Sequence, residues 1–283
     1  MLQVVEDIYE AQKTFEELRQ QGRSVGLVPT MGSLHKGHVS LVERARLRCD
    51  VVAVSIFVNA IQFNDVNDHR QYPRSTEADL AMLASAGVDF VLLPTDEQMH
   101  PKPMNVLITT SGAAELLEGV HRPGHFDGVA TVVAKLFIIL GPGLAFFGEK
   151  DFQQLVVVRR MVSELHFPVE IVGCPTVREP DGLAMSSRNL RLTEADRAKA
   201  PIVHRAILAA RQAYAAGETS GRGLIAVMYE VLSSVQDLVI DYASVVDPQT
   251  LKDVDHAKPD SRLVVAVHLG SVRLIDNSAV GGD

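Results

Sequence analysis

The segment from Val51 to Val58 constrains the fold of this 283-residue chain more than any other segment. It reads Val-Val-Ala-Val-Ser-Ile-Phe-Val, so it is almost entirely apolar and rich in β-branched side chains. Such a strand has no polar face to turn toward water, and it is therefore buried on both faces. Burial on both faces is typical of a parallel sheet that is covered by helices on each side. The sequence thus predicts an α/β fold.

Further apolar strands alternate with amphipathic helices along residues 1–175. Strands are predicted at Val25–Val28, Val51–Val58, Val88–Leu93, Leu144–Phe147 and Val169–Val172. Helical spacing of apolar residues predicts helices at 5–21, 37–48, 80–86, 128–140 and 152–165. This alternation predicts a doubly wound, Rossmann-like parallel sheet, which binds ligands beyond the carboxyl ends of its strands.

The pattern changes after residue 175. A long helix is predicted from Glu194 to Ala216, and a second helix from Gly223 to Ser234. Strands are predicted at Leu238–Val246, Leu263–Leu269 and Val272–Ile275, the last two joined by a Gly270-Ser271 hairpin turn. Helices followed by antiparallel strands predict a smaller α+β domain over residues 176–283.

Composition and charge exclude several classes of protein. A net charge of −8, with 47% hydrophobic and 22% charged residues, is typical of a globular protein without general attraction to nucleic acid. Cys49 and Cys174 are too isolated for a disulfide framework or a zinc site. Signal-peptide features are missing, and apolar stretches such as 129–144 are too short to span a bilayer. We expect a cytoplasmic protein with neither nucleic-acid nor membrane partners.

The segment from His35 to His38 reads His-Lys-Gly-His and lies between a predicted strand and a predicted helix. Free backbone amides and the helix dipole attract phosphate at such a helix start, and Gly32 and Gly37 allow close approach. Two imidazoles would stabilise the charge of departing pyrophosphate. The alternatives are two surface histidines or a metal pair, although helical metal pairs more often lie four residues apart.

The loop Gly182–Asn189 combines small residues with two hydroxyls and a cation. Ser186, Ser187 and Arg188 would make hydrogen bonds and charge-assisted contacts to phosphate if the loop folds over a ligand. The alternative interpretation is a polar linker between the two predicted domains.

Two further polar pairs follow predicted strands. Lys150 and Asp151 lie at a strand-to-helix junction, although Asp151 is also suited to cap the helix and Lys150 to remain solvated. Asn59 and Gln62 follow Val58 and would bind a polar substrate, or satisfy backbone groups of their own loop. Because parallel strands end at one edge of a sheet, these residues are predicted to share one cleft with the histidines.

The two-histidine motif and the later Met-Ser-Ser-Arg loop resemble the HIGH/KMSKS signature of the nucleotidyltransferase superfamily, which includes class I aminoacyl-tRNA synthetases. More narrowly, the chain resembles the pantothenate synthetase (pantoate–β-alanine ligase) family. The segments that carry this resemblance are Val28–His38, Ser55–Asn59, Gln62–Phe63, Tyr72–Arg74, His121–Phe126, Phe147–Leu155, Met185–Asn189 and Leu274–Asn277. They extend over essentially the whole chain.

The resemblance implies an ATP-dependent condensation of pantoate with β-alanine to pantothenate. Pantoate would attack the α-phosphate of ATP to give pantoyl adenylate and pyrophosphate, and β-alanine would then displace AMP. Mg²⁺ would be carried on the phosphates, with no direct protein ligand, and the family implies a homodimer through the N-terminal domain. Another adenylyltransferase with a phosphorylated acceptor, and a non-catalytic nucleotide-binding protein, remain the alternatives.

The resemblance also implies roles for individual residues. It implies an ATP site at Met31, Gly32, Ser33, Leu34, His35, Lys36, Gly37, His38, Gly148, Glu149, Lys150, Asp151, Val177, Met185, Ser186, Ser187 and Arg188. Of these, His35, His38, Lys150, Ser186, Ser187 and Arg188 are the implied catalytic residues, with His38 as proton donor. Pantoate and β-alanine would contact Asn59, Gln62 and Gln154.

Two segments complete the sequence-based expectations. Where the family has proline after the asparagine, this chain has Ala60, which should loosen the loop that carries Gln62. The run from His121 to Phe126 is either ligand-facing or a structural loop, and it is not included in the predicted site.

Overall fold

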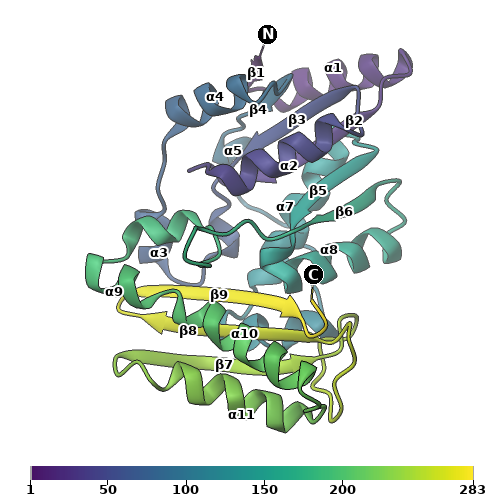
Figure 1. Cartoon of the computed structure of the whole chain (residues 1–283). Coiled ribbons are helices and arrows are strands. Elements are labelled where there is room, and N and C mark those ends of the chain that lie inside the picture. The colour runs from purple at the N-terminus through teal and green to yellow at the C-terminus, as the bar shows by residue number, and fades with distance from the viewer. Residues whose placement is uncertain (1, 283) are drawn as a thin grey trace.

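The computed structural model describes residues 2–282, so residues 1 and 283 of the predicted domains lie outside the described part. It contains a six-stranded parallel sheet and a separate three-stranded antiparallel sheet (Figure 1). The parallel strands are β1 Gln3–Val5, β2 Val25–Thr30, β3 Val51–Ile56, β4 Phe90–Leu92, β5 Leu144–Gly148 and β6 Glu170–Cys174. Their order in space is β1-β4-β3-β2-β5-β6, which confirms the predicted doubly wound fold.

Helices cover both faces of the parallel sheet. On one face lie α1 Ile8–Gln20, α7 His125–Leu140 and α8 Phe152–Glu164, and on the other α2 Lys36–Arg46 and α4 Thr76–Ser85. Val51 and Ala53 of β3 belong to the first of these cores, whereas Val52 and Val54 belong to the second. Because neighbouring residues of a strand point to opposite faces, both sets must be apolar, which explains the continuous run in β3.

Several short elements were not predicted. They are the helices α3 Val66–Gln71, α5 Asp96–Met99 and α6 Glu118–His121, with the 3-10 helices η1 Ala60–Gln62, η2 Gly112–Glu115, η3 Glu149–Asp151 and η4 Ser187–Arg191. One or two turns are too short to show a hydrophobic period. Strand β1 was also missed, and the predicted first helix wrongly included Val5, which is the last residue of that strand.

The second sheet is antiparallel and is covered by two helices (Figure 1). Its strands are β7 Leu238–Val246, β8 Arg262–Leu269 and β9 Val272–Ala279, and the helices are α10 Ile202–Ala215 and α11 Gly221–Leu232. Leu224 and Met228 of α11 and Ile207 of α10 are fully buried in the same core as Leu263 and Val267 of β8. The predicted hairpin between the last two strands is confirmed, with Gly270 at φ +57°.

The single helix predicted from Glu194 to Ala216 is wrong. The chain forms α9 Glu194–Lys199 and then α10, and Pro201 lies between them. Proline has no amide hydrogen to donate, and its ring clashes with the preceding turn, so one continuous helix cannot pass through this position. The apolar residues on either side keep a helical spacing, and for that reason the pattern suggested one helix.

The last predicted strand stopped at Ile275, but β9 continues to Ala279. Its polar residues are buried because they join the small sheet to the end of β5. Asn277 donates from Nδ2 to the carbonyl oxygens of Glu149 at 3.0 Å and Lys150 at 2.8 Å. Asp276 accepts from Arg178 Nη1 at 2.6 Å. The small sheet therefore holds the backbone at Lys150 directly.

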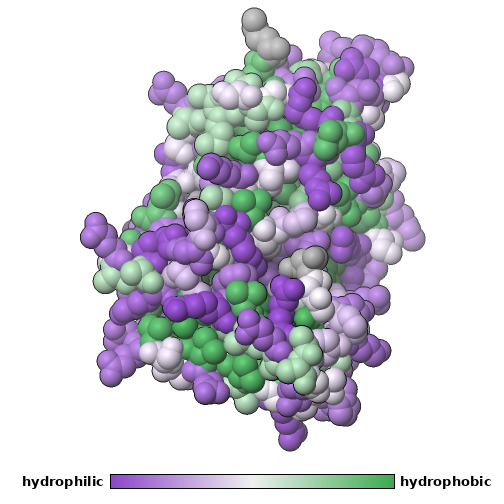
Figure 2. Space-filling model, viewed as in Figure 1, coloured by the Kyte–Doolittle hydropathy of each residue, from purple (hydrophilic) through white to green (hydrophobic). Residues whose placement is uncertain are grey.

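The surface is mainly hydrophilic on the face shown in Figure 2, where apolar side chains appear in small groups. Within residues 2–282, none of the helices combines the length and the apolar character needed to cross a membrane. The division into domains after residue 175 stays a prediction. The separate cores around the two sheets are what favours it.

Candidate active site

The main cavity lies between β2 and β5, where the order in which the strands are added to the parallel sheet reverses. From β2 the chain proceeds to β3 on one side, whereas β5 and β6 lie on the other side. The loops that leave the carboxyl ends of β2 and β5 therefore separate, which is where open α/β sheets bind ligands. Met31 and His38 after β2, and Gly148 and Lys150 after β5, line the cavity found there.

The loop between β2 and α2 is held by one buried carboxylate. Asp79 of α4 is 2% exposed and accepts hydrogen bonds from the amides of Ser33 and Leu34, both at 2.8 Å. Gly32 has φ +80°, and a Cβ atom there would lie 3.0 Å from Asp79 Oδ2. A glycine is thus needed both for the left-handed backbone and for the close approach of Asp79. The loop enters α2 in one defined conformation.

His35 and His38 cap the start of α2 reciprocally. His35 Nδ1 accepts from the Gly37 amide at 3.1 Å, and His38 Nδ1 accepts from the His35 amide at 3.2 Å. Each Nδ1 atom is therefore unprotonated, so the hydrogen of each neutral ring lies on Nε2. The two ring centroids are 4.1 Å apart. Both imidazoles line the cavity.

The environment keeps both histidines neutral. Burial lowers the pKa of His38 to about 3, with a further contribution from His35. Burial and then the charge of Lys150 lower the pKa of His35 to about 4. Near pH 7 the two rings can therefore donate hydrogen bonds through Nε2 without carrying charge. That suits them to contact phosphate oxygens as they gain charge.

Gln62 is fixed at the opposite side of the same cavity. Its side-chain Oε1 accepts from Asn59 Nδ2 at 2.8 Å, and its Nε2 lies 3.3 Å from the sulfur of Met31. Its backbone carbonyl accepts from His125 Nδ1 at 2.8 Å. With the oxygen occupied, the side-chain amide presents hydrogen-bond donors to the cavity.

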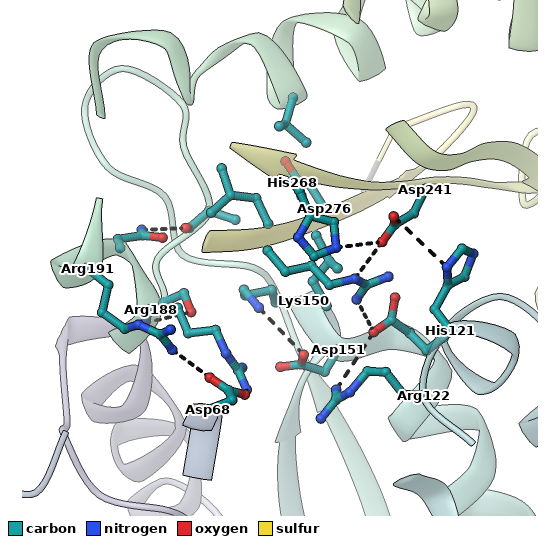
Figure 3. A pocket seen from close by; sticks show the side chains of 18 of the residues that line it. Asp68, His121, Arg122, Lys150, Asp151, Arg188, Arg191, Asp241, His268 and Asp276 are labelled. Carbon is teal, nitrogen blue, oxygen red and sulfur yellow. Dashed lines mark hydrogen bonds and ion pairs between the residues drawn. The ribbon is translucent and has the colours of Figure 1, made fainter. Parts of the chain in front are cut away.

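The loop from Gly182 to Asn189 closes against α3 and the segment that follows it. Ser187 Oγ lies 3.1 Å from the hydroxyl of Tyr72, and Arg188 Nη2 donates to Asp68 at 2.9 Å (Figure 3). Burial alone would raise the pKa of Asp68, but Arg188 and Arg191 outweigh it and hold that pKa below its usual range. The loop is thus anchored across the cavity by a charged pair.

A second, strongly charged cavity adjoins the first, and the two share Lys150, Asp151, Arg188, Arg122 and Ser186 in their linings. Figure 3 shows Asp68 beside Arg188 and Arg191 at one end of this cavity, and Asp241 between His121 and His268 at the other. Lys150 Nζ lies 3.5 Å from Asp151 in the middle. The cationic groups here are paired, so the cavity presents positive and negative charge side by side.

Most of the residues implied by the resemblance meet in the main cavity. They are Met31, His35, Gly37, His38, Asn59, Gln62, Gly148, Lys150, Asp151, Gln154, Val177, Met185, Ser186, Ser187 and Arg188. The others lie away from its lining. The backbone amides of Ser33 and Leu34 donate to Asp79. Gly32 lines a separate cavity together with Asp79, and the side chain of Lys36 is exposed. Glu149 pairs with Arg262 of the small sheet at 3.1 Å.

Tyr72, Arg122 and His125 are among the residues that line the cavity but were absent from the predicted site. His125 Nδ1 donates to Gln62, and its Nε2 accepts from Arg122 Nη1 at 3.2 Å, so both ring nitrogens are assigned. Burial and then Arg122 lower the pKa of His125 to about 4. The signal for Arg122 and His125 was the run from His121 to Phe126, which sequence reasoning treated as an open alternative. Tyr72 lies in the segment Tyr72–Arg74 that carried part of the resemblance.

Fold and site together define an α/β enzyme of the nucleotidyltransferase type, with two histidines at a helix start and a cationic loop that crosses the cavity from the side of the small sheet. The family model "Pantoate-beta-alanine ligase" matches residues 3–279 of the chain. The chain belongs to the pantoate–β-alanine ligase family.

Relatives and solved structures of the same family match this chain over almost its whole length. The pantothenate synthetase of Chloroflexus aggregans is 54% identical over 280 residues, with 98% of this chain and 99% of that protein covered. That of Trichlorobacter lovleyi is 46% identical, with 99% of each chain covered. The crystal structure of pantothenate synthetase from Thermus thermophilus has a TM-score of 0.93 at 44% identity, covering 98% and 99% of the two chains.

A more distant structure carries ligands. The pantoate–β-alanine ligase of Francisella tularensis, described as complexed with β-γ ATP and β-alanine, has a TM-score of 0.82 at 32% identity. It covers 100% of this chain, and 99% of that chain is matched.

The neutral histidines predict how stability depends on pH. In the unfolded chain His38 takes up a proton near pH 6.5, but in the folded protein only near pH 3. The free energy of unfolding should therefore fall as the pH is lowered from about 7 to about 4, because the unfolded state binds more protons. His38→Asn, which keeps an acceptor at the Nδ1 position, should make that decline shallower in urea titrations at a series of pH values.

His256 lies exposed in the small domain, so His256→Asn is the matched control and should leave the decline unchanged. Equal pH slopes for the wild type and His38→Asn would show that His38 is not held neutral by the fold.

Proposed function

We propose that this chain condenses pantoate with β-alanine at the expense of ATP, through a pantoyl-adenylate intermediate, at the cavity between β2 and β5. The observation that carries the proposal is the placement of two neutral histidine donors, Lys150 and the Arg188 loop around one cavity that also holds Gln62. The family match and the ATP and β-alanine complex of the Francisella relative support the substrate class.

In the first step a carboxylate oxygen of pantoate attacks the α-phosphorus of ATP, and the bond to the bridging oxygen of pyrophosphate breaks. His35 and His38 donate hydrogen bonds from Nε2 to phosphate oxygens that gain negative charge. Lys150 and Arg188 supply positive charge on the other side. His38, which the resemblance implies as the proton donor, is proposed to direct its Nε2 hydrogen to a phosphate oxygen as a neutral ring, because burial lowers its pKa to about 3.

In the second step the neutral amine of β-alanine attacks the acyl carbon of pantoyl adenylate, AMP leaves with the carboxyl oxygen bound to phosphorus, and the proton that the amine nitrogen loses passes to the phosphate of the departing AMP. No protein nucleophile is needed, so the contribution of the protein is to hold the reactants together. Gln62, Asn59 and Gln154 are proposed to position pantoate, and the loop of Ser186 to Arg188 to keep water from the adenylate.

Mg²⁺ is proposed to arrive with the triphosphate, whose charge it would neutralise. Within residues 2–282, no group of three or more histidine, cysteine, aspartate or glutamate side chains is arranged to hold a metal ion.

A transfer of AMP to a phosphorylated acceptor is the other candidate reaction, and the family match over residues 3–279 does not favour it.

We also propose a cytoplasmic homodimer joined through residues 1–175, with residues 176–283 as a second domain over the site. Light scattering should give twice the 30.8 kDa mass of the chain, and a monomeric mass would contradict the dimer.

Release of pyrophosphate from ATP should require pantoate, and pantothenate should form only when β-alanine is added. The order follows from the mechanism, because the adenylate must form before the amine can attack. A coupled pyrophosphate assay with each substrate omitted in turn measures both steps. Pyrophosphate release that depends on a phosphorylated acceptor instead of pantoate would contradict the proposal.

Ala60→Pro tests whether the loop of Gln62 is looser than in relatives with proline. Position 60 is the first residue of η1, and Asn59 has extended backbone angles of φ −74° and ψ 98°, so the local geometry accepts proline. The variant should raise the free energy of unfolding by about 0.4–1 kcal/mol and lower the KM for pantoate about twofold. Ala60→Gly should do the opposite, and an unchanged KM in Ala60→Pro would contradict the idea.

A further inference from the structure

The side chain of Asn59 is buried in the wall of the cavity, at 1% exposure, and a backbone carbonyl fixes its orientation. Its Nδ2 donates to the carbonyl oxygen of Gly128 in α7 at 3.0 Å. A backbone carbonyl only accepts, so the atom that faces it must be the nitrogen of the amide. The second hydrogen of the same nitrogen is directed to Gln62 Oε1 at 2.8 Å.

The oxygen of the Asn59 amide is turned to His100. Asn59 Oδ1 lies 2.7 Å from His100 Nε2, and an amide oxygen can only accept, so His100 must donate from Nε2. His100 is the residue directly after α5, the short helix that follows β4 in the chain, and it is 9% exposed. Its ring packs against Phe57 with centroids 5.5 Å apart. Among the described residues, Asn59 and Phe57 line the main cavity and His100 does not.

The hydrogen on His100 Nε2 is not shared with another acceptor. The contact with Asn59 Oδ1 at 2.7 Å requires the single hydrogen of the neutral ring on Nε2, which leaves the buried Nδ1 unprotonated and without a hydrogen bond of good geometry within residues 2–282. Burial, and then the positive charge of Lys135, hold the pKa of His100 below its usual range, which keeps the ring neutral. His100 is therefore a donor with one defined tautomer.

A chain of hydrogen bonds with one direction runs from His100 through Asn59 to Gln62. Because the Gln62 oxygen is engaged by Asn59, its Nε2 group is turned toward the cavity beside Met31. A reversed amide would present an oxygen there instead. The carboxylate oxygens of an acid such as pantoate need a donor at this place and would be repelled by an oxygen.

We propose that His100 is a positioning residue for the acid substrate: by donating to Asn59 it holds, together with the carbonyl oxygen of Gly128, the amide orientation that decides which end of Gln62 faces the cavity. This inference rests on the proposed function, because it names pantoate as the ligand of that amide. His100 acts 41 positions away from Asn59 in the chain and makes no contact with the substrate itself.

Two variants of His100 separate a positioning role from a purely structural one. His100→Leu removes the donor, whereas His100→Gln places an amide nitrogen near the former Nε2 position and can still donate. We expect His100→Leu to raise the KM for pantoate about tenfold, the loss typical of one buried hydrogen bond, and to leave the KM for ATP within twofold. His100→Gln should stay within about threefold of the wild type, and the exposed control His256→Leu should change neither constant.

A pantoate KM that is unchanged in His100→Leu would overturn the inference, as would equal rises of both KM values with a matching fall in Tm. Histidine ¹⁵N NMR of the wild type supplies a test that needs neither activity nor a folded variant. The hydrogen of His100 is expected on Nε2, and a hydrogen on Nδ1 would overturn the proposal. Wild-type protein that releases no pyrophosphate with pantoate would instead refute the proposed function.

Discussion

The reciprocal hydrogen bonds between His35 and His38 are the constraint on which the rest of the site depends. They satisfy backbone amides that would otherwise lack partners at the start of α2, and they leave the hydrogen of each neutral ring on Nε2. The tautomers of the two histidines are thus a consequence of helix capping. Asp79 makes this possible, because it holds the preceding loop in the left-handed conformation that leads into the cap.

The two sheets contribute to one site through short buried contacts. Asn277 of β9 binds the carbonyl oxygen of Lys150, so the strand-to-helix junction after β5 is held from the side of the small sheet. The loop that carries Arg188 crosses from that side to Asp68 in α3. A rearrangement of the small sheet would therefore move Lys150 and Arg188 together, and that coupling suits a loop that must open for substrates and exclude water afterwards.

The sequence was most informative where a pattern has one physical solution. The apolar run of β3 required burial on both faces, and the histidines between a strand and a helix required a helix-start site. It was less informative where one residue interrupts a regular pattern or an element is short, as at Pro201 and β1. The polar residues Asp276 and Asn277 suggested that the strand ends before them, because the partners that bury them are distant in the chain.

By itself, the sequence determined the α/β class and the order of strands and helices around the site, and it singled out His35, His38, Lys150 and Arg188 as candidate site residues. These follow from burial periodicity and from residue types at short spacing, which are local properties of the chain. Only the tertiary structure decided which side chains share hydrogen bonds, such as His125 with Gln62, 63 positions apart. Proton positions and pKa values depend on such partners and on burial, and neither is determined before the chain has folded.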